Sequence, residues 1–173
     1  MGVFKKGKKQ FELDFATVQK INLFVNKDYQ GLLNIFDVTD NVYNHATVLM
    51  NITKTRPKIK VDFKDGKPSY TLDLNLVMYI EEIVQKEQSS TFMRRNKEFY
   101  TSTLLEKIKQ KVIDQLNDAA QFCKTNNVDL INVYQNFNCF KNKQFKEYLN
   151  KVGKQNYLQD VDFNFNVTIE SAY

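Results

Sequence analysis

Apolar and polar residues alternate along two stretches near the middle of the chain, 58–64 and 70–80. A period of two is typical of a β-strand that buries one face. Between them stands Asp65-Gly66, a pair suited to the two positive-φ positions of a tight type I′ turn. The pattern therefore predicts a long antiparallel hairpin whose second strand ends near Ile83 or Val84. Its apolar positions are Ile59, Val61, Phe63, Tyr70, Leu72, Leu74, Leu76, Met78 and Ile80.

Other stretches also favour strands. Residues 31–36 do so weakly, and residues 47–56 do so by alternation, with Pro57 marking a break or an edge position. Residues 161–169 alternate as regularly as the hairpin. Val3-Phe4 and 11–13 flank a Lys-rich turn and predict a separate short hairpin.

Four stretches show the three-to-four residue spacing of an amphipathic helix. The longest begins after a cap at Thr101 or Ser102 and ends at Asn126-Asn127, because asparagine tolerates the left-handed conformation at a helix end. Its apolar side is formed by Leu104, Leu105, Ile108, Val112, Ile113, Leu116, Ala119 and Cys123. The shorter predicted helices are residues 15–24 after an Asp14 cap, 130–136 after an Asp129 cap, and 144–152 before Gly153. Residues 137–140 are not assigned, and 85–96 are predicted to form a loop.

This order of strands, helices and a returning strand indicates the α+β class. We expect an antiparallel sheet of about four to five strands, with a long helix and two to three shorter helices packed on one face. The closing strand should join the same sheet, because a lone strand with an apolar face is not stable. The whole chain, 1–173, is expected to form a single domain.

The net charge of +5 comes mainly from lysine, with arginine only at positions 56, 94 and 95. Base readout and bidentate phosphate binding favour arginine, so the charge is a weak signal for a nucleic-acid partner. The densest cluster, 5–9, fits a hairpin loop; contact with an anionic membrane surface is the alternative. The loop 92–95, Phe-Met-Arg-Arg, is either a solvated linker or a partner-binding loop.

No arrangement of residues predicts a catalytic, cofactor-binding or metal-binding site. His45 is the single histidine and lacks a nucleophile motif around it. The carboxylate pairs Glu81-Glu82, expected to project to opposite faces, and Asp160 with Asp162 have no partners that would suit acid-base or metal chemistry. Cys123 is interpreted as a buried core thiol, with a Cys123–Cys139 bridge as the alternative.

Five stretches, taken in order, resemble the C-terminal domain of the Ger(x)C family, the C subunits of nutrient germinant receptors in spore-forming bacteria. They are Gly2-Val3-Phe4-Lys5-Lys6-Gly7-Lys8 followed by Leu13-Asp14, the 58–68 hairpin ending in Asp65-Gly66-Lys67-Pro68, helix 105–121, Val128-Asp129-Leu130-Ile131, and strand 161–169. The chain departs from the family at Asn132-Val133-Tyr134, where glycine is frequent, and at Gln155-Asn156-Tyr157-Leu158, where tryptophan is frequent.

The resemblance implies a non-enzymatic subunit without cofactors. On this resemblance the subunit is expected to act in receptor assembly and germination signalling, with the integral-membrane A and B subunits as partners. It also implies a lipoprotein on the outer face of the spore inner membrane, of which this chain is the C-terminal part and whose lipid anchor lies elsewhere. Two other classes stay open: a basic α+β nucleic-acid-binding module and a small enzyme with an unrecognised site.

Overall fold

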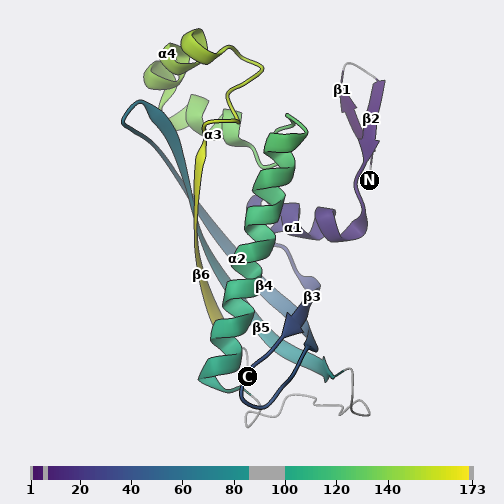
Figure 1. Cartoon of the computed structure of the whole chain (residues 1–173). Helices are drawn as coiled ribbons and strands as arrows, with labels where there is room; N and C mark the ends of the chain where they lie inside the picture. Colours follow the sequence, from purple (N-terminus) through teal and green to yellow (C-terminus); the bar gives the residue numbers. More distant parts are fainter. Residues whose placement is uncertain (1, 6–7, 86–99, 172–173) are drawn as a thin grey trace.

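The computed structural model describes the backbone of residues 2–5, 8–85 and 100–171. Within these residues the strands form a two-stranded sheet, β1-β2, and a four-stranded sheet in the order β3-β4-β5-β6 (Figure 1). The strands are β1 (Gly2–Lys5), β2 (Lys8–Glu12), β3 (Gly31–Val38), β4 (Ala46–Lys64), β5 (Lys67–Val84) and β6 (Asp162–Ser171). The helices are α1 (Phe15–Val25), α2 (Ser102–Thr125), α3 (Val133–Phe140) and α4 (Asn142–Val152). The α+β class is confirmed.

The predicted central hairpin is confirmed as β4 and β5. Lys64 pairs with Lys67 across a two-residue turn in which Asp65 has φ 50° and Gly66 has φ 77°. Pro57 does not break β4, which runs through it. β3 pairs with β4 only as far as Gly31 opposite Ile52, so Pro57 lies where β4 has become an edge strand.

The closing strand β6 joins this sheet as predicted, but its pairing is parallel to β5. The reason lies in α2, whose 24 residues extend about 36 Å at 1.5 Å per residue. This helix carries the chain from the end of β5 back to the hairpin tip (Figure 1). β6 therefore starts beside Ser69 and runs in the same direction as β5, as in a crossover connection. The sheet is mixed, with its first three strands antiparallel.

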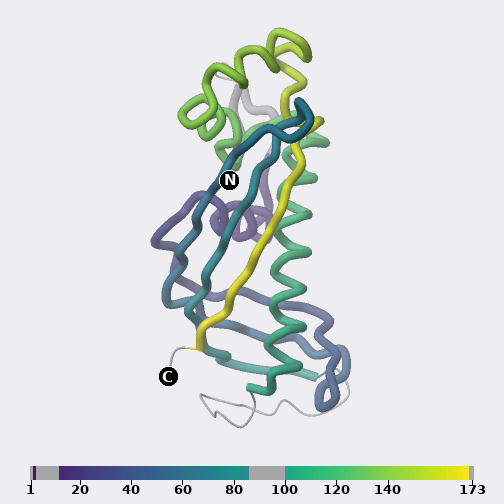
Figure 2. Tube along the Cα trace, turned by 90° about the vertical axis from the view of Figure 1, so that its left-hand side faces the viewer, coloured from purple at the N-terminus to yellow at the C-terminus, as the bar shows by residue number. Residues whose placement is uncertain are grey.

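The long helix α2 covers the apolar face of the sheet. Its cap is Thr101, whose hydroxyl accepts from the backbone N–H of Leu104 at 3.0 Å. Leu104, Ile108, Val112, Leu116, Ala119, Ala120 and Cys123 are its buried residues, which confirms most of the predicted stripe. Figure 2, turned by 90° from Figure 1, shows β4, β5 and β6 running alongside α2, so one side of the sheet faces this helix and the other side is open. We call this open side the outer face.

The shorter helices differ in detail from the prediction. Asp14 caps α1 through Thr17 N–H at 2.7 Å, as expected, but Phe15 is 76% exposed instead of buried. The helix after Asp129 was expected at residues 130–136; α3 begins three residues later, after Asn132 in the left-handed conformation, and includes residues 137–140. Helices α3 and α4 lie at the tip of the β4–β5 hairpin (Figure 1).

Candidate partner-binding surface

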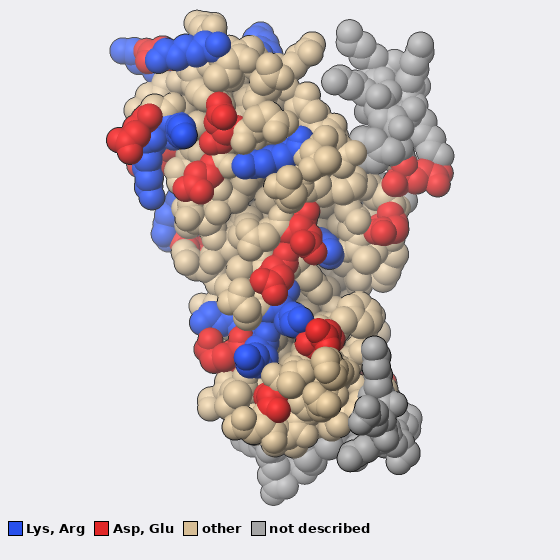
Figure 3. Space-filling view, in the orientation of Figure 1, with Lys and Arg blue, Asp and Glu red and all other residues tan. Residues whose placement is uncertain are grey.

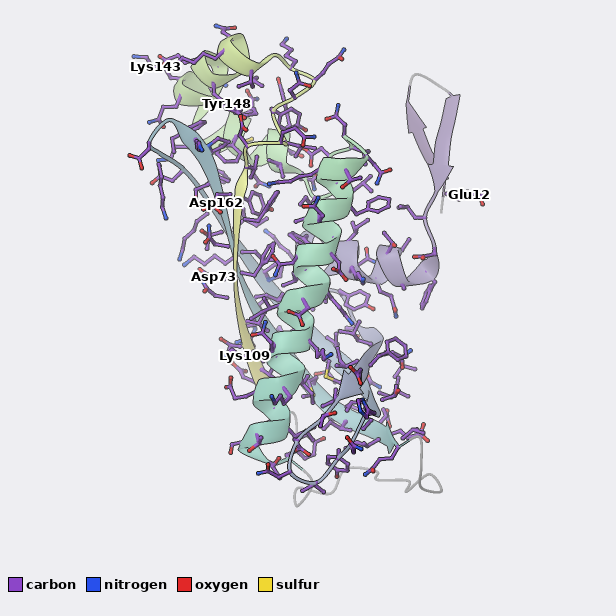
Figure 4. The ribbon with its side chains drawn as sticks, viewed as in Figure 1. Glu12, Asp73, Lys109, Lys143, Tyr148 and Asp162 are labelled. Atoms are coloured by element: carbon purple, nitrogen blue, oxygen red, sulfur yellow. The ribbon has the colours of Figure 1, made fainter. Side chains whose placement is uncertain are left out.

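The outer face consists of the strand residues that point away from α2. They alternate with the core residues along each strand and are exposed or half-buried. The central part of this face is formed by Arg56, Lys58, Lys60, Thr71, Asp73, Asn75, Asn164, Asn166, Thr168 and Glu170. Figure 4 shows Asp73 on the side of the sheet turned away from α2.

Asp73 ties three strands together at the centre of the outer face. Its carboxylate accepts from Lys60 Nζ on β4 at 2.6 Å and from Asn166 Nδ2 on β6 at 2.7 Å. These two bonds hold the pKa of Asp73 below its usual range, with Lys60 as the larger cause. The group is therefore charged at neutral pH and fixes the relative positions of β4, β5 and β6.

A second cross-strand contact lies towards the end of β6. Glu170 accepts a hydrogen bond from Asn75 Nδ2 at 2.5 Å, and its other oxygen lies 3.9 Å from Arg56 Nη1. Arg56 and Lys60 remain 53% and 59% exposed despite these contacts. Lys58, between them, makes no salt bridge with any described residue. The outer face of β4 therefore presents a row of three cations at every second position.

Polar side chains hold α3 and α4 in place beside the hairpin tip. Asp129 accepts from the backbone N–H of Val133 at 2.9 Å and of Tyr134 at 2.7 Å, and Tyr157 donates its hydroxyl to the same carboxylate at 2.8 Å. Burial, followed by the charge of Asp129, raises the pKa of Tyr157 far above its ordinary value. Lys141 reaches across to Asp62 on β4 at 2.7 Å. The tip is thus a fixed part of the described structure.

His45 lies on the surface, away from the other candidate residues. Its side chain is 61% exposed and its Nδ1 lies 2.5 Å from Asp37 Oδ1. A bulge in the β4–β5 pairing brings Glu81 and Glu82 to the same side, since Glu81 accepts from Asn51 and Glu82 lies opposite Leu49. The expectation that these two carboxylates project to opposite faces is therefore wrong.

Asp160 and Asp162 do lie close together. They line a hollow of about 450 Å³ with Lys64 and Lys67 at the hairpin tip. Asp160 accepts a hydrogen bond from the Tyr148 hydroxyl at 3.3 Å, and Asp162 accepts one from Asn164 Nδ2 at 3.2 Å. Tyr148 and Asp162 are marked in Figure 4. Both acids therefore have nearby cationic or hydrogen-bonding partners that account for their positions.

The two cysteines are separate free thiols, so the alternative of a bridge is wrong. Cys123 is buried, as predicted, and Cys139 is exposed. Burial raises the pKa of the Cys123 thiol to about 11, which makes it a poor nucleophile at neutral pH.

Two predicted sites lie wholly or partly outside the described residues. The loop 92–95 lies outside them, and the cluster 5–9 is described only as the backbone of β1 and β2. In the described part of the chain, no group of three His, Cys, Asp or Glu side chains could hold a metal ion. In the part of the chain that the structure describes, no helix combines the length and the apolar character of a membrane span.

Charges of both signs are interspersed over the face seen in Figure 3.

The sequence matches the family described as spore germination B3/GerAC-like, C-terminal, over residues 1–171. The chain belongs to this family. It is the family of germinant-receptor C subunits, and the resemblance stated from the sequence is confirmed. The comparison with curated proteins returned no relative.

A search of solved structures returned the crystal structure of the GerBC protein. It matches this GerAC-like chain with a TM-score of 0.69 at 15% identity. The match covers 96% of this chain and 48% of GerBC, so the chain spans about half the length of that protein. At this identity the likeness shows a shared fold.

Sequence reasoning missed the residues that organise the outer face. Strand alternation marks Asp73 and Asn166 only as polar positions of their strands. The alternation of polar and apolar residues already indicates that Asp73 and Asn166 lie on the polar face of the sheet, as do Arg56, Lys58 and Lys60. The parallel register of β6 was needed to place Asn166 directly opposite Asp73.

Proposed function

We propose that this chain is a non-enzymatic C-subunit domain of a spore nutrient germinant receptor, acting in receptor assembly and germination signalling. The observation that carries the proposal is the family match over residues 1–171. The similarity of the fold to GerBC supports it. We further propose that residues 1–173 form one domain.

The proposed partners are the integral-membrane A and B subunits of the receptor. The full-length protein would lie on the outer face of the spore inner membrane, held by a lipid anchor. The open outer face supports a role in assembly, because its cross-strand ties present a fixed polar surface that a neighbouring subunit can recognise.

Deletion and complementation in spores test this function. Spores that lack the full-length gene should lose the germination response to at least one nutrient, measured by the fall in optical density and the loss of heat resistance. Complementation with the full-length gene should restore the response. An affinity tag on the full-length protein should co-isolate the A and B subunits from detergent extracts of spore membranes. An unchanged response to every nutrient tested, together with no co-isolation, would contradict the proposal.

The same protein can be titrated with short duplex DNA and single-stranded RNA. A germinant-receptor domain should show no binding at moderate salt. A nucleic-acid-binding module should bind, with the logarithm of its affinity falling linearly with the logarithm of salt concentration.

A further inference from the structure

The edge of β4 between Pro57 and Val61 has no strand paired with it in the described structure, although the side chain of Val61 is in the core and this residue is only 8% exposed. The two-residue turn makes Lys64 and Lys67 a hydrogen-bonded pair, so every second residue back along β4, including Lys60 and Lys58, bonds to β5. The intervening residues, Pro57, Ile59 and Val61, therefore direct their backbone groups to the opposite edge. Among the described residues no strand pairs there, because β3 ends its pairing opposite Ile52.

Both ends of this edge are covered. Thr55 donates its hydroxyl to the carbonyls of Asn26 and Tyr29 in the chain between α1 and β3. At the other end the N–H of Phe63 is bonded by the Asp62 carboxylate, and Lys141 reaches Asp62 from the α3–α4 corner. The open part is five residues long, about 16 Å at 3.3 Å per residue. It offers two N–H groups and three carbonyls, since Pro57 has no N–H.

The two sides of this open edge differ in chemistry. On the outer face stand the exposed cations Arg56, Lys58 and Lys60. On the inner side lies a mainly apolar hollow of about 300 Å³, between the end of α1 and α3. Val25, Ile59 and Phe140 line it, and Phe140 is 69% exposed.

We propose that a short extended segment of a partner protein, with acidic and apolar residues in alternation, adds to the sheet along Lys58–Asp62. Its backbone bonds to the free groups of Ile59 and Val61, as in other cases of β-augmentation. Its alternate side chains then face opposite sides of the sheet. Acidic side chains meet Lys58 and its two neighbours, and apolar side chains fill the hollow. This proposal does not depend on the germinant-receptor function.

The test uses the full chain and a capped hexapeptide of alternating glutamate and valine, followed by amide NMR and hydrogen exchange. In the free chain, the amides of Ile59 and Val61 should exchange faster than those of Lys58 and Lys60. A peptide concentration ten times its dissociation constant should slow exchange at Ile59 and Val61 by about tenfold. Added salt should weaken binding.

Matched probes and variants separate strand addition from non-specific attraction. The same peptide with every amide N-methylated, and a lysine-valine peptide, should not bind. Lys58→Glu should weaken binding by about tenfold or more, while Lys107→Glu on the exposed side of α2 leaves it unchanged. Ile59→Pro removes the backbone N–H of Ile59 at the open edge and should abolish the protection that the peptide gives to Val61. If Ile59→Pro does not fold, the binding affinity of Lys58→Glu decides the test.

Four outcomes would overturn the proposal. They are equal protection of Ile59 and Lys58 amides in the free chain, equal binding of the N-methylated peptide, chemical shift changes confined to another surface, and no binding at millimolar peptide.

Discussion

Asp129 is the side chain whose removal should most clearly loosen the start of α3 from the segment between α4 and β6. Its carboxylate receives two backbone N–H groups at the start of α3 and the hydroxyl of Tyr157. Asp129→Ala removes all three hydrogen bonds at once. The substitution leaves the buried hydroxyl of Tyr157 and the backbone N–H groups of Val133 and Tyr134 without their acceptor.

The expected loss of stability in Asp129→Ala follows from these three hydrogen bonds. Loss of a side-chain cap costs about 0.5–2 kcal/mol. Loss of a hydrogen bond to a charged group costs about 1.5–3 kcal/mol, and Asp129 is only half-buried, so water replaces part of it. We expect Asp129→Ala to lower the free energy of unfolding by about 3 kcal/mol and the melting temperature by about 6–12 °C for a chain of this size.

Urea unfolding followed by circular dichroism measures this change, and a double-mutant cycle assigns it. Tyr157→Phe removes only the hydroxyl, so Asp129→Ala and Tyr157→Phe should be non-additive by about 1–2 kcal/mol. Asp160→Ala is the matched control, because its carboxylate receives the longer 3.3 Å bond from Tyr148; it should cost less than about 1 kcal/mol. A loss below about 1 kcal/mol for Asp129→Ala, or strict additivity with Tyr157→Phe, would refute this reasoning.

Four further outcomes are expected. A thiol reagent should modify only Cys139 in the native chain and both cysteines after denaturation, as counted by absorbance, because Cys123 is fully buried. The pKa of Cys123 is raised from 9.0 to about 11, so its contribution to stability is complete below pH 9 and is lost as the pH rises towards 11. The urea midpoint should fall over that range, and less steeply in Cys123→Ala. Leu116→Ala should destabilise by about 2–5 kcal/mol and the half-buried Leu105→Ala by clearly less, as measured by the same unfolding assay. Gly66→Ala should cost about 1–2 kcal/mol in that assay because φ is 77°, although open space surrounds the added methyl group.

The elements that could be predicted are those in which one local signal decides the structure. Asp65-Gly66 between alternating runs admits one tight turn, and the structure has it. Asp14 and Thr101 are capping residues at the start of apolar periodicity, and both accept the expected N–H groups. In each case the deciding contacts lie within four residues of one another, where propensity and pattern act directly.

The elements that could not be predicted depend on contacts distant in sequence. Asp129 begins a predicted helix as a capping residue, yet Asn132 adopts a left-handed conformation and delays the helix. The Asp129 carboxylate still reaches the same helix because Tyr157, 28 residues away, holds it in place. The parallel direction of β6 likewise depends on where α2 ends relative to the hairpin tip. A long helix between two strands of one sheet is typical of a crossover that joins parallel strands. The expectation of an antiparallel sheet did not take this pattern into account.

The position of Pro57 relative to the hairpin turn predicts that β4 has an unpaired edge at this point. Counting back from the Asp65-Gly66 turn, odd-numbered residues of β4 as far as Thr55 do not direct their backbone groups to β5. Pro57 is one of them, so its missing N–H removes nothing from the β4–β5 ladder. Had another strand continued along this edge, the proline would have removed a bond from that pairing instead. The turn and the proline together therefore indicate that β4 has no strand at Pro57 on the edge away from β5. The described structure agrees, because the pairing of β3 with β4 reaches only Gly31 opposite Ile52.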